Sequence, residues 1–332
     1  MTGNRVNDRV LVTGGSGFLG TNLVNAFLRA GAAVASVDCV PPRNAAQGPC
    51  WIEADLRDSA AMTKAVSDFQ PTEVIHMGAR TDLRGKRLED YDANTTGVET
   101  VANTVLGCPS VRRVIYASSM LVCRTGYWPT SDDDYAPSTV YGESKIVGER
   151  IVRNLGNTGP TWVIVRPTSI WGPWFGTPYR EFFEAVLRER FVKFGGAGAR
   201  KTFGYVGNLV FQIESLLDAP GERVQGRTFY LGDHPPLQIS EWAEIIAREA
   251  GVRCPRTVPL WVARGAAKAG DLLLRVGVDA PLSSFRLSNI TTDNEIPLDP
   301  IYDVAGVPPY AARDGVRETL AWLAAAAREE TK

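Results

Sequence analysis

Histidine is scarce in this 332-residue sequence, which holds only His76 and His234. Two histidines are too few for a histidine-rich metal site and argue against a Ser-His-Asp hydrolase, so we expect no metal. The five cysteines are scattered and odd in number, and no pair of them has the spacing of zinc ligands. This usage is typical of reduced thiols in a cytoplasmic protein.

The sequence also lacks an excess of either charge and any long apolar run. Lys and Arg number 36 and Asp and Glu number 37, which gives a formal net charge of −1. We therefore expect no nucleic acid partner, and we see no basic amphipathic segment that would favour a membrane. The N-terminus is short and polar, so we expect neither a signal peptide nor a membrane-spanning segment.

A glycine-rich turn follows the first apolar run and precedes a helical pattern. This order of strand, tight turn and helix is typical of dinucleotide binding. Gly14 lets the chain turn, Gly17 admits a pyrophosphate to the backbone, and Gly20 lets helix and strand pack closely. Phe18 and Leu19 open the helix, whose N-terminal amides and dipole would hold the phosphates.

The second strand, residues 33–37, ends at Asp38, which lies 18 residues beyond Gly20. A dinucleotide-binding fold places there the acid that binds the adenosine ribose hydroxyls. Its negative charge would repel a 2′-phosphate, so NAD is favoured over NADP, although Arg43 nearby leaves NADP open. The alternative is a loop aspartate that caps the turn before two prolines.

Further strands at residues 51–54, 74–79 and 111–117 alternate with helical patterns at 59–69 and about 90–106. This alternation predicts an α/β fold of Rossmann type, with a doubly wound parallel sheet and right-handed crossovers. Ligands of such folds bind at the carboxyl ends of the strands. We interpret His76 as a packed residue at a strand end.

The fifth strand ends in Ser118-Ser119, and a helix opens with Tyr141 and Lys145. Side chains at i and i+4 lie on one helix face, so the ammonium would stabilise a tyrosinate and lower the phenol pKa from about 10. A lone Tyr-x-x-x-Lys occurs often by chance. After a dinucleotide fingerprint and a Ser-Ser strand end, it indicates an acid–base site.

At this point the chain resembles the extended short-chain dehydrogenase/reductases, specifically the NAD-dependent epimerase/dehydratase family, which acts mostly on nucleotide sugars. The resemblance covers nearly the whole chain and includes a late segment, residues 315–323, that looks like the family's closing helix. The other motifs that carry it are Thr13 to Gly20, Asp38, Asp55-Leu56, His76-x-Gly78-Ala79, Asn94-x-x-Gly97, Ser118-Ser119, Tyr141-x-x-x-Lys145 and Arg166-Pro167.

The resemblance implies a role for each matching residue. Tyr141 would be the general acid–base at the sugar carbinol or ketone, Lys145 would hold the nicotinamide ribose and tune Tyr141, and Ser119 would bind the reacting oxygen. The cofactor-binding residues that it implies are Gly14, Gly17, Phe18, Leu19, Gly20, Asp38, Asp55, Leu56, Gly78, Ala79, Asn94, Tyr141, Lys145 and Pro167.

The sequence departs from the family pattern directly after Ser119. Family dehydratases carry Asp-Glu there, which protonates the leaving hydroxyl and abstracts the proton beside the ketone. Met120 and Leu121 can do neither, which argues against a 4,6-dehydratase. The family's nucleotide-sugar decarboxylases usually carry a Glu there, so that activity is disfavoured as well.

Residues 1–168 are expected to form the NAD-binding domain, joined by strands returning near 203–210 and 228–231, and residues 169–332 mostly the substrate domain. The family's diphosphate-binding Asn is replaced by Ser169, and its Tyr-Val-Asp-Asp motif becomes Tyr-Val-Gly-Asn, which leaves the substrate open. The candidate substrate-binding residues are Ser119, Ser169, Lys201 and Arg286. Lys201 and Arg286 would clamp a diphosphate, the alternative for each being a solvated surface charge.

The leading hypothesis is an NAD-dependent epimerase that acts at C4 of a UDP-, dTDP- or GDP-linked sugar through a transient 4-keto intermediate. The alternatives are an NAD(P)-dependent nucleotide-4-ketosugar reductase, a hydroxysteroid-type dehydrogenase and a non-catalytic NAD-sensing protein. The resemblance also implies a homodimer built from the helices that carry Asn94 and Tyr141.

Overall fold

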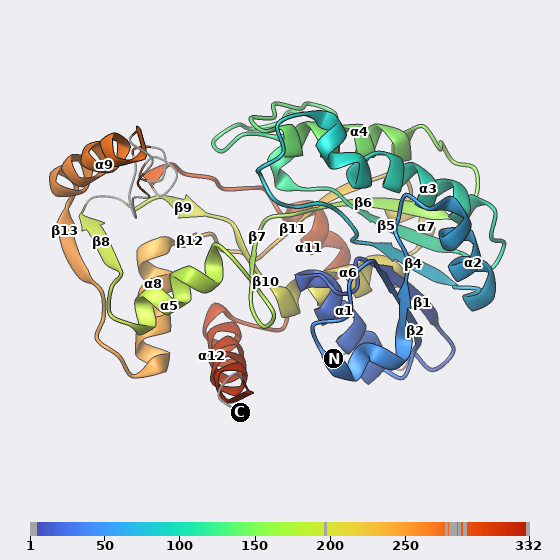
Figure 1. Ribbon diagram of the computed structural model, residues 1–332, viewed down its shortest axis with the longest axis horizontal. Coiled ribbons are helices and arrows are strands. Elements are labelled where there is room, and N and C mark those ends of the chain that lie inside the picture. The colour runs from blue at the N-terminus through green and yellow to red at the C-terminus, as the bar shows by residue number, and fades with distance from the viewer. Residues whose placement is uncertain are drawn as a thin grey trace.

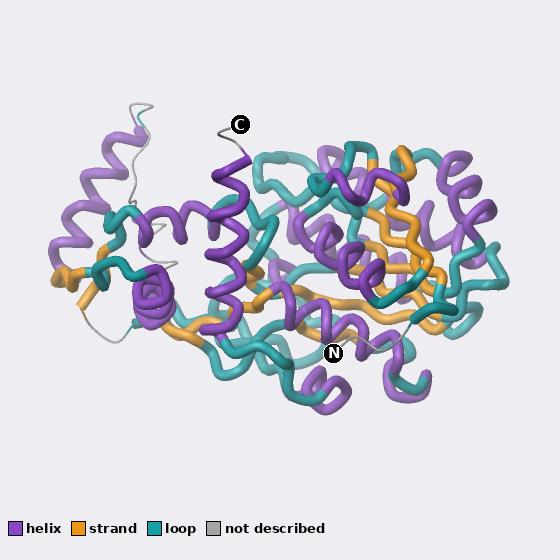
Figure 2. Tube along the Cα trace, turned by 90° about the horizontal axis from the view of Figure 1, so that it is seen from below, coloured by secondary structure: helices purple, strands orange, loops and turns teal. Residues whose placement is uncertain are grey.

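The computed structural model describes residues 5–195, 198–275, 278, 284, 287 and 291–329. A seven-stranded sheet with helices on both faces fills one end, and smaller sheets and helices project from it at the other (Figures 1 and 2). The strand order is β11-β6-β5-β4-β1-β2-β3, and every neighbouring pair is parallel. The predicted doubly wound α/β fold is confirmed.

The bounds of the elements follow the predicted alternation closely. The strands of the main sheet are β1 (Arg9–Thr13), β2 (Ala33–Asp38), β3 (Trp51–Glu53), β4 (Glu73–His76), β5 (Arg113–Ala117), β6 (Thr161–Pro167) and β11 (Thr228–Leu231). The helices that flank them are α1 (Phe18–Arg29), α2 (Ser59–Phe69), α3 (Thr96–Leu106), α4 (Val140–Arg153), α6 (Val206–Asp218), α7 (Gly221–Val224) and α11 (Asp299–Ala305), with the 3-10 helices η1 (Ala45–Cys50), η2 (Leu88–Asn94) and η3 (Met120–Val122).

Within the part of the chain that the structure describes, three two-stranded sheets and four helices make up the smaller end. The strand pairs are β7 (Ser169–Trp171) with β10 (Phe203–Tyr205), β9 (Arg200–Lys201) with β12 (Leu237–Gln238), and β8 (Val192–Gly195) with β13 (Arg256–Pro259). The helices are α5 (Tyr179–Leu187), α8 (Ile239–Ala250), α9 (Leu260–Arg275) and α12 (Ala312–Glu329).

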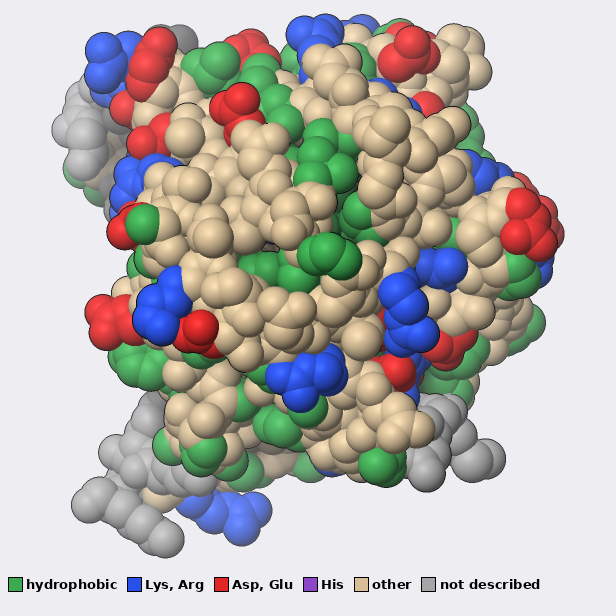
Figure 3. Space-filling view, turned by 90° about the vertical axis from the view of Figure 1, so that its right-hand side faces the viewer, with side chains coloured by type: hydrophobic (Ala, Val, Ile, Leu, Met, Phe, Trp, Pro, Cys, Tyr) green, Lys and Arg blue, Asp and Glu red, His purple; other side chains and the backbone are tan. Residues whose placement is uncertain are grey.

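The main sheet is apolar on both faces because helices cover each of them. Val10 and Val12 of β1 pack in one core cluster with residues of α1 and α6, whereas Leu11 packs in a second cluster with residues of α2 and α3. All three are fully buried, as the two-residue alternation of a strand requires. On the outer face drawn in Figure 3, cationic and anionic side chains of the described residues are interspersed.

An aromatic cluster forms the core of the smaller end. Trp171 and Trp242 are both buried, with ring centroids 5.1 Å apart, and Phe183 of α5 packs against each of them. Trp171 therefore belongs to the core of the smaller end.

Two predicted elements differ from the structure. The strand expected near 203–210 is only β10, which pairs with β7 rather than with the main sheet, and α6 begins at Val206. The carboxylate of Asp233 accepts hydrogen bonds from the Tyr205 amide at 2.6 Å and from the Asn208 side chain at 2.8 Å, which fixes the start of the helix. The helix expected over about 90–106 is interrupted at Thr95, which separates η2 from α3.

Candidate active site

The glycine-rich turn between β1 and α1 leaves no room for side chains. Gly14 has a φ of +68°, and a Cβ there would lie 2.5 Å from the amide nitrogen of Gly78 at the end of β4. A Cβ on Gly20 would lie 2.1 Å from the carbonyl oxygen of Gly14. Among the described residues no side chain caps α1, so the amides of Phe18 and Leu19 remain available to a pyrophosphate.

Asp38 holds its carboxylate beside this turn. Its Oδ2 accepts a hydrogen bond from the amide of Ser16 at 3.0 Å, and its Oδ1 accepts one from the amide of Val40 at 3.2 Å. Each oxygen keeps further acceptor capacity for ribose hydroxyls. A carboxylate at this position fits NAD and repels the 2′-phosphate of NADP.

Arg43 joins the turn to a loop from the smaller end of the molecule. Its guanidinium donates to the carbonyl oxygens of Ser16 and Trp174, each at 3.0 Å. Asn22 of α1 donates to the carbonyl of Pro173 at 2.9 Å. We call residues 173–175 the clasp loop, because these bonds fasten them to the turn that would hold the pyrophosphate. The sequence analysis considered Arg43 only as a sign of NADP and missed this role.

Two further cofactor candidates meet at the end of β4. A Cβ on Gly78 would lie 2.4 Å from Leu56, so only glycine lets the end of β4 pack this closely against Leu56. Asp55 is engaged by Arg57, which donates to its Oδ2 at 2.5 Å and lowers the pKa of Asp55 to about 2. Its carboxylate therefore stays ionised.

Asn94 is buried, and its side chain is hydrogen-bonded to other residues of the protein. Its side-chain amide donates to the carbonyl of Arg80 and to the hydroxyl of Ser144 in α4, and its oxygen accepts from the amide of Arg80 at 2.8 Å. Asn94 thereby holds the segment after Ala79 against α4. Pro167 ends β6 in register with Leu231 of β11.

Ser119, Tyr141 and Lys145 come together between the end of β5 and the first turns of α4. The hydroxyl of Ser119 lies close enough to the phenol of Tyr141 to influence its pKa, and both side chains are buried. Ser119 Oγ accepts a hydrogen bond from the amide of Leu121 at 3.1 Å. The Nζ of Lys145 donates to the carbonyl of Ala117 at 2.9 Å. The i, i+4 spacing on α4 thus places both side chains at the carboxyl end of β5, as predicted.

The protonation states of this pair are set mainly by burial. Burial raises the pKa of Tyr141 to about 12, and the polar hydroxyl of Ser119 opposes that shift. Burial lowers the pKa of Lys145 to about 8, and the carboxylate of Glu149 opposes that shift. The expected lowering of the phenol pKa by Lys145 is therefore not provided by the protein alone.

A buried ion pair lies one helical turn beyond Lys145. Glu149 of α4 accepts from the Nε and Nη2 of Arg166 in β6, each at 2.8 Å, and also from the hydroxyl of Tyr135 at 2.8 Å. The sequence analysis did not single out Glu149. Its position at i+4 from Lys145, on the same face of α4, is the signal that would have indicated it.

His76 is fully buried at the end of β4, with its Nδ1 2.7 Å from the hydroxyl of Thr13. Burial lowers its pKa to about 3, so the ring is neutral. This agrees with the interpretation of His76 as a packed residue.

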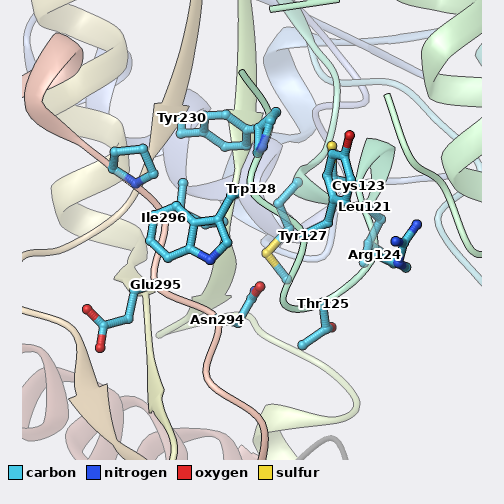
Figure 4. Close-up of a pocket in the computed structure, with 13 residues that line it drawn as sticks. Leu121, Cys123, Arg124, Thr125, Tyr127, Trp128, Tyr230, Asn294, Glu295 and Ile296 are labelled. Carbon is cyan, nitrogen blue, oxygen red and sulfur yellow. The ribbon is translucent and has the colours of Figure 1, made fainter. Parts of the chain in front are cut away.

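A pocket opens beside the loop that follows Ser119 (Figure 4). One wall is formed by Met120, Leu121 and Trp128, and the other by Tyr230 and Ile296. The lining is largely apolar and aromatic, and no carboxylate stands at the two positions after Ser119. Met120 and Leu121 therefore line the pocket at the two positions where family dehydratases carry Asp-Glu.

The candidate substrate residues are not gathered into one cluster. Ser169 begins β7, and its proximity opposes the rise that burial gives to the pKa of Tyr179. Lys201 ends β9 and is half-buried, and burial lowers its pKa while Asp293 opposes the shift. Arg286 lies outside the described residues.

A family model identifies the protein family of this chain. The model of the NAD dependent epimerase/dehydratase family matches residues 10–232. The chain belongs to this family. The predicted family, the enzymatic nature of the protein and its NAD cofactor are thereby confirmed.

Similar proteins include dehydrogenases and epimerases. The 3 beta-hydroxysteroid dehydrogenase/Delta 5-->4-isomerase of Mycobacterium tuberculosis H37Rv is 30% identical over 296 residues, covering 82% of this chain and 78% of that protein. The N-acetyl-alpha-D-glucosaminyl-diphospho-ditrans,octacis-undecaprenol 4-epimerase of Escherichia coli O157:H7 is 25% identical over 329 residues, covering 95% of each.

The fold is shared with solved structures of the family. The epimerase Mth375 from Methanothermobacter thermautotrophicus matches with a TM-score of 0.74 at 20% sequence identity, covering 97% of this chain and 94% of that one. Within the described residues, no helix has the length and apolar character needed to cross a bilayer.

Proposed function

We propose that the protein is an NAD-dependent epimerase that inverts C4 of a sugar carried on a diphosphate, through a transient 4-keto intermediate. The observation that carries this proposal is the buried pair Ser119 and Tyr141 beside two apolar residues, Met120 and Leu121. The pair can exchange a proton with a sugar hydroxyl. The apolar residues offer no acid or base for eliminating water, so the site favours oxidation and re-reduction at one carbon.

The proposed roles follow from these positions. Deprotonated Tyr141 accepts the proton of the C4 hydroxyl, while Ser119 donates a hydrogen bond to the same oxygen. Bound NAD⁺ supplies the acceptor for the hydride that leaves C4. The buried ammonium of Lys145 stabilises negative charge near the phenol. After the keto sugar has rotated in the site, the hydride would return to the opposite face of C4 and Tyr141 would return the proton to the oxygen.

Epimerisation requires that the cofactor stays bound between the two half-reactions. The clasp loop supports such retention, because Asn22 and Arg43 bind its carbonyls beside the glycine-rich turn. The rings of Phe18 and Phe175 add a contact with centroids 6.5 Å apart. Cofactor release would have to break or bypass these contacts.

In every candidate substrate, the sugar is attached to its carrier through a diphosphate. Lys201 supplies one cation on the substrate side, where a half-buried ammonium can pair with a phosphate. The similar protein from Escherichia coli is named for a sugar diphosphate attached to undecaprenol, and it aligns over 95% of both chains. A UDP-, dTDP- or GDP-linked sugar and a lipid-linked sugar present the same chemistry to Lys201.

The test begins with the protein as purified, without added cofactor. Denaturation and mass analysis of the released nucleotide should give close to one NAD per chain. The protein should then interconvert UDP-N-acetylglucosamine or undecaprenyl-diphosphate N-acetylglucosamine with its C4 epimer. In D₂O the product should carry no deuterium at C4, since the hydride returns internally.

The variant Tyr141→Phe tests the acid–base role of Tyr141, because it removes only the phenol hydroxyl. It should lower turnover by about 10²- to 10⁴-fold, which is the usual contribution of a positioned acid–base, and leave the NAD content unchanged. Unchanged turnover in this variant would overturn the proposed role of Tyr141.

A second candidate, a hydroxysteroid-type dehydrogenase, is favoured by the 30% identity to the Mycobacterium tuberculosis enzyme. It would use the same Ser119, Tyr141 and Lys145. Stoichiometric formation of NADH with a 3β-hydroxysteroid, together with a site that is empty of NAD on purification, would replace the epimerase by this dehydrogenase.

A further inference from the structure

Helix α9 is the outermost helix at the end of the molecule opposite the main sheet (Figures 1 and 2). It packs inward through Ala263 and Ala267, which are 2% and 0% exposed, against β8 and β13. These positions are four residues apart, so they define one face of the helix. The opposite face is therefore the one turned to solvent.

The outward face of α9 is apolar, which is unusual for an exposed helix. Trp261 is 75% exposed and Leu272 is 62% exposed, and Val262 and Leu273 are exposed beside them. The positions between them, at i+4 and i+8 from Trp261 and at i+4 from Val262, are Gly265, Ala269 and Ala266, which are exposed as well. An apolar stripe of this kind marks an interaction surface rather than a solvated one.

Positive charge borders this stripe. Arg264 and Lys268 are exposed along one edge of it, four residues apart, and no carboxylate of the described residues forms an ion pair with either. Residues 253–275 hold five cationic side chains and one carboxylate, a net charge of +4 in a chain whose total is −1. The carboxylate, Asp271, already accepts a hydrogen bond from the amide of Ser284.

These features favour one occupant over the others. A second copy of the chain would bring the same cations against each other across a two-fold axis, which is unfavourable. An anionic bilayer satisfies both features at once, because its interface accepts Trp and Leu while its headgroups attract Lys and Arg. The sequence analysis saw no basic amphipathic segment; α9 is one, with its apolar side turned outward.

The inner side of α9 leads towards the proposed active site. Leu260 and Arg264 line a pocket together with Phe194 of β8 and Ala199. The chain runs directly from Ala199 to Lys201, the cation proposed to meet the diphosphate. A sugar carrier that enters beside α9 would thus reach Lys201 along β9.

We infer that α9 docks on an anionic membrane surface and that the sugar carrier is a membrane lipid, a polyprenyl diphosphate, rather than a soluble nucleotide. The docking surface stands on α9 alone, whereas the identity of the carrier rests on the proposed epimerase function. The proposed contact is with the surface of the bilayer, and within the described residues no helix is long and apolar enough to cross it.

Sedimentation with vesicles tests the docking surface. The full chain should bind vesicles of phosphatidylcholine with 30% phosphatidylglycerol, and bind pure phosphatidylcholine far more weakly. Arg264→Gln with Lys268→Gln should lower the partition coefficient roughly 30-fold, at about 1 kcal/mol per cation near the surface. Binding of the wild-type chain should also weaken in high salt.

Trp261→Gln should weaken vesicle binding, whereas the matched control Trp128→Gln, a tryptophan 61% exposed outside α9, should not. Circular dichroism verifies that each variant is folded. Equal binding of wild type and all α9 variants, or no binding to anionic vesicles, would overturn the inference.

Activity assays separate failure of this inference from failure of the proposed function. Trp261→Gln should keep activity on a short, water-soluble diphosphate-linked sugar and lose it on undecaprenyl-diphosphate sugar embedded in vesicles. Epimerisation of soluble substrates without vesicle binding would remove the membrane inference and leave the epimerase. Vesicle binding without epimerisation of any diphosphate-linked sugar would leave the docking surface and remove the epimerase and the proposed carrier.

Discussion

Tyr141 lies where its phenol is difficult to ionise. Burial raises its pKa to about 12, while burial lowers the pKa of Lys145 to about 8. At neutral pH both groups therefore hold their protons, and the base form of Tyr141 depends on positive charge brought near it. The ammonium of Lys145 does not lower the phenol pKa in the protein alone, so we expect the base form of Tyr141 to depend on the bound cofactor, whose cationic ring would supply that charge.

Glu214 illustrates how burial acts on stability rather than on catalysis. It lies in α6 and is 7% exposed, with its Oε1 lacking a hydrogen-bond partner among the described residues. Burial raises its pKa to about 7, whereas an unfolded chain would give a value near 4.5. Between these two pH values the folded state binds the proton more tightly, so stability falls as pH rises from about 4.5 to 7.

Glu214→Gln should remove this pH dependence. We expect the free energy of unfolding of the native chain to fall by roughly 1–3 kcal/mol across this window relative to the variant. Urea titrations at pH 5, 6, 7 and 8 measure the difference. Glu222→Gln changes an exposed carboxyl and should leave the slope intact; a slope that survives in Glu214→Gln would contradict the assignment.

The sequence indicates candidate site residues where a local pattern determines the geometry. The turn from Gly14 to Gly20 and the pair Tyr141 and Lys145 were found because a strand, a tight turn and an i, i+4 spacing are local. Arg43 and Glu149 were missed because their partners, Trp174 and Arg166, are distant in the chain. The i+4 position of Glu149 relative to Lys145 is local and could have indicated that residue, but no local pattern indicates the distant partners themselves.

At the scale of elements, β10 shows where sequence patterns fail. Residues 203–210 are apolar enough to suggest a strand, but the chain turns into α6 after Tyr205 because Asp233, 28 residues later, binds its amide. The helix α2, in contrast, matches the predicted bounds of 59–69, since Asp58 caps it locally by accepting from the amides of Ala60 and Ala61. A helix start can be predicted from the sequence when the capping residue directly precedes it, but not when the residue that binds it lies far along the chain.

The clasp loop gives a prediction at the same scale. Arg43→Ala removes the bonds to the carbonyls of Ser16 and Trp174, so bound NAD should dissociate at least several-fold faster, and the purified variant should carry less NAD. Stopped-flow displacement of NAD measures the rate. Arg190→Ala, at an exposed residue just beyond α5, is the control; an unchanged rate in Arg43→Ala would show that the loop does not retain the cofactor.

At the scale of the whole molecule, the C-terminal helix reaches back to the cofactor turn. Trp322 of α12 packs against Trp174 and Phe175, with ring centroids 5.7 and 5.9 Å apart. The residues matched by the family model end at 232, so α12 lies beyond them, yet it supports the clasp loop from outside. Arg43 and Trp322 thus hold the same loop from two parts of the chain, one through carbonyls and one through rings.

Trp322→Ala should therefore have two linked effects. Loss of a half-buried indole should destabilise the chain by roughly 1–3 kcal/mol, less than a fully buried aromatic, and it should speed NAD release, because the clasp loop loses its outer support. Combined with Arg43→Ala, the two changes should be non-additive in the NAD release rate, since residues that act on one loop are coupled. Trp128→Ala, at an exposed tryptophan, controls for general effects of indole loss. If instead Trp322→Ala lowers stability while NAD release stays at the wild-type rate, α12 packs on the loop without helping it to hold the cofactor.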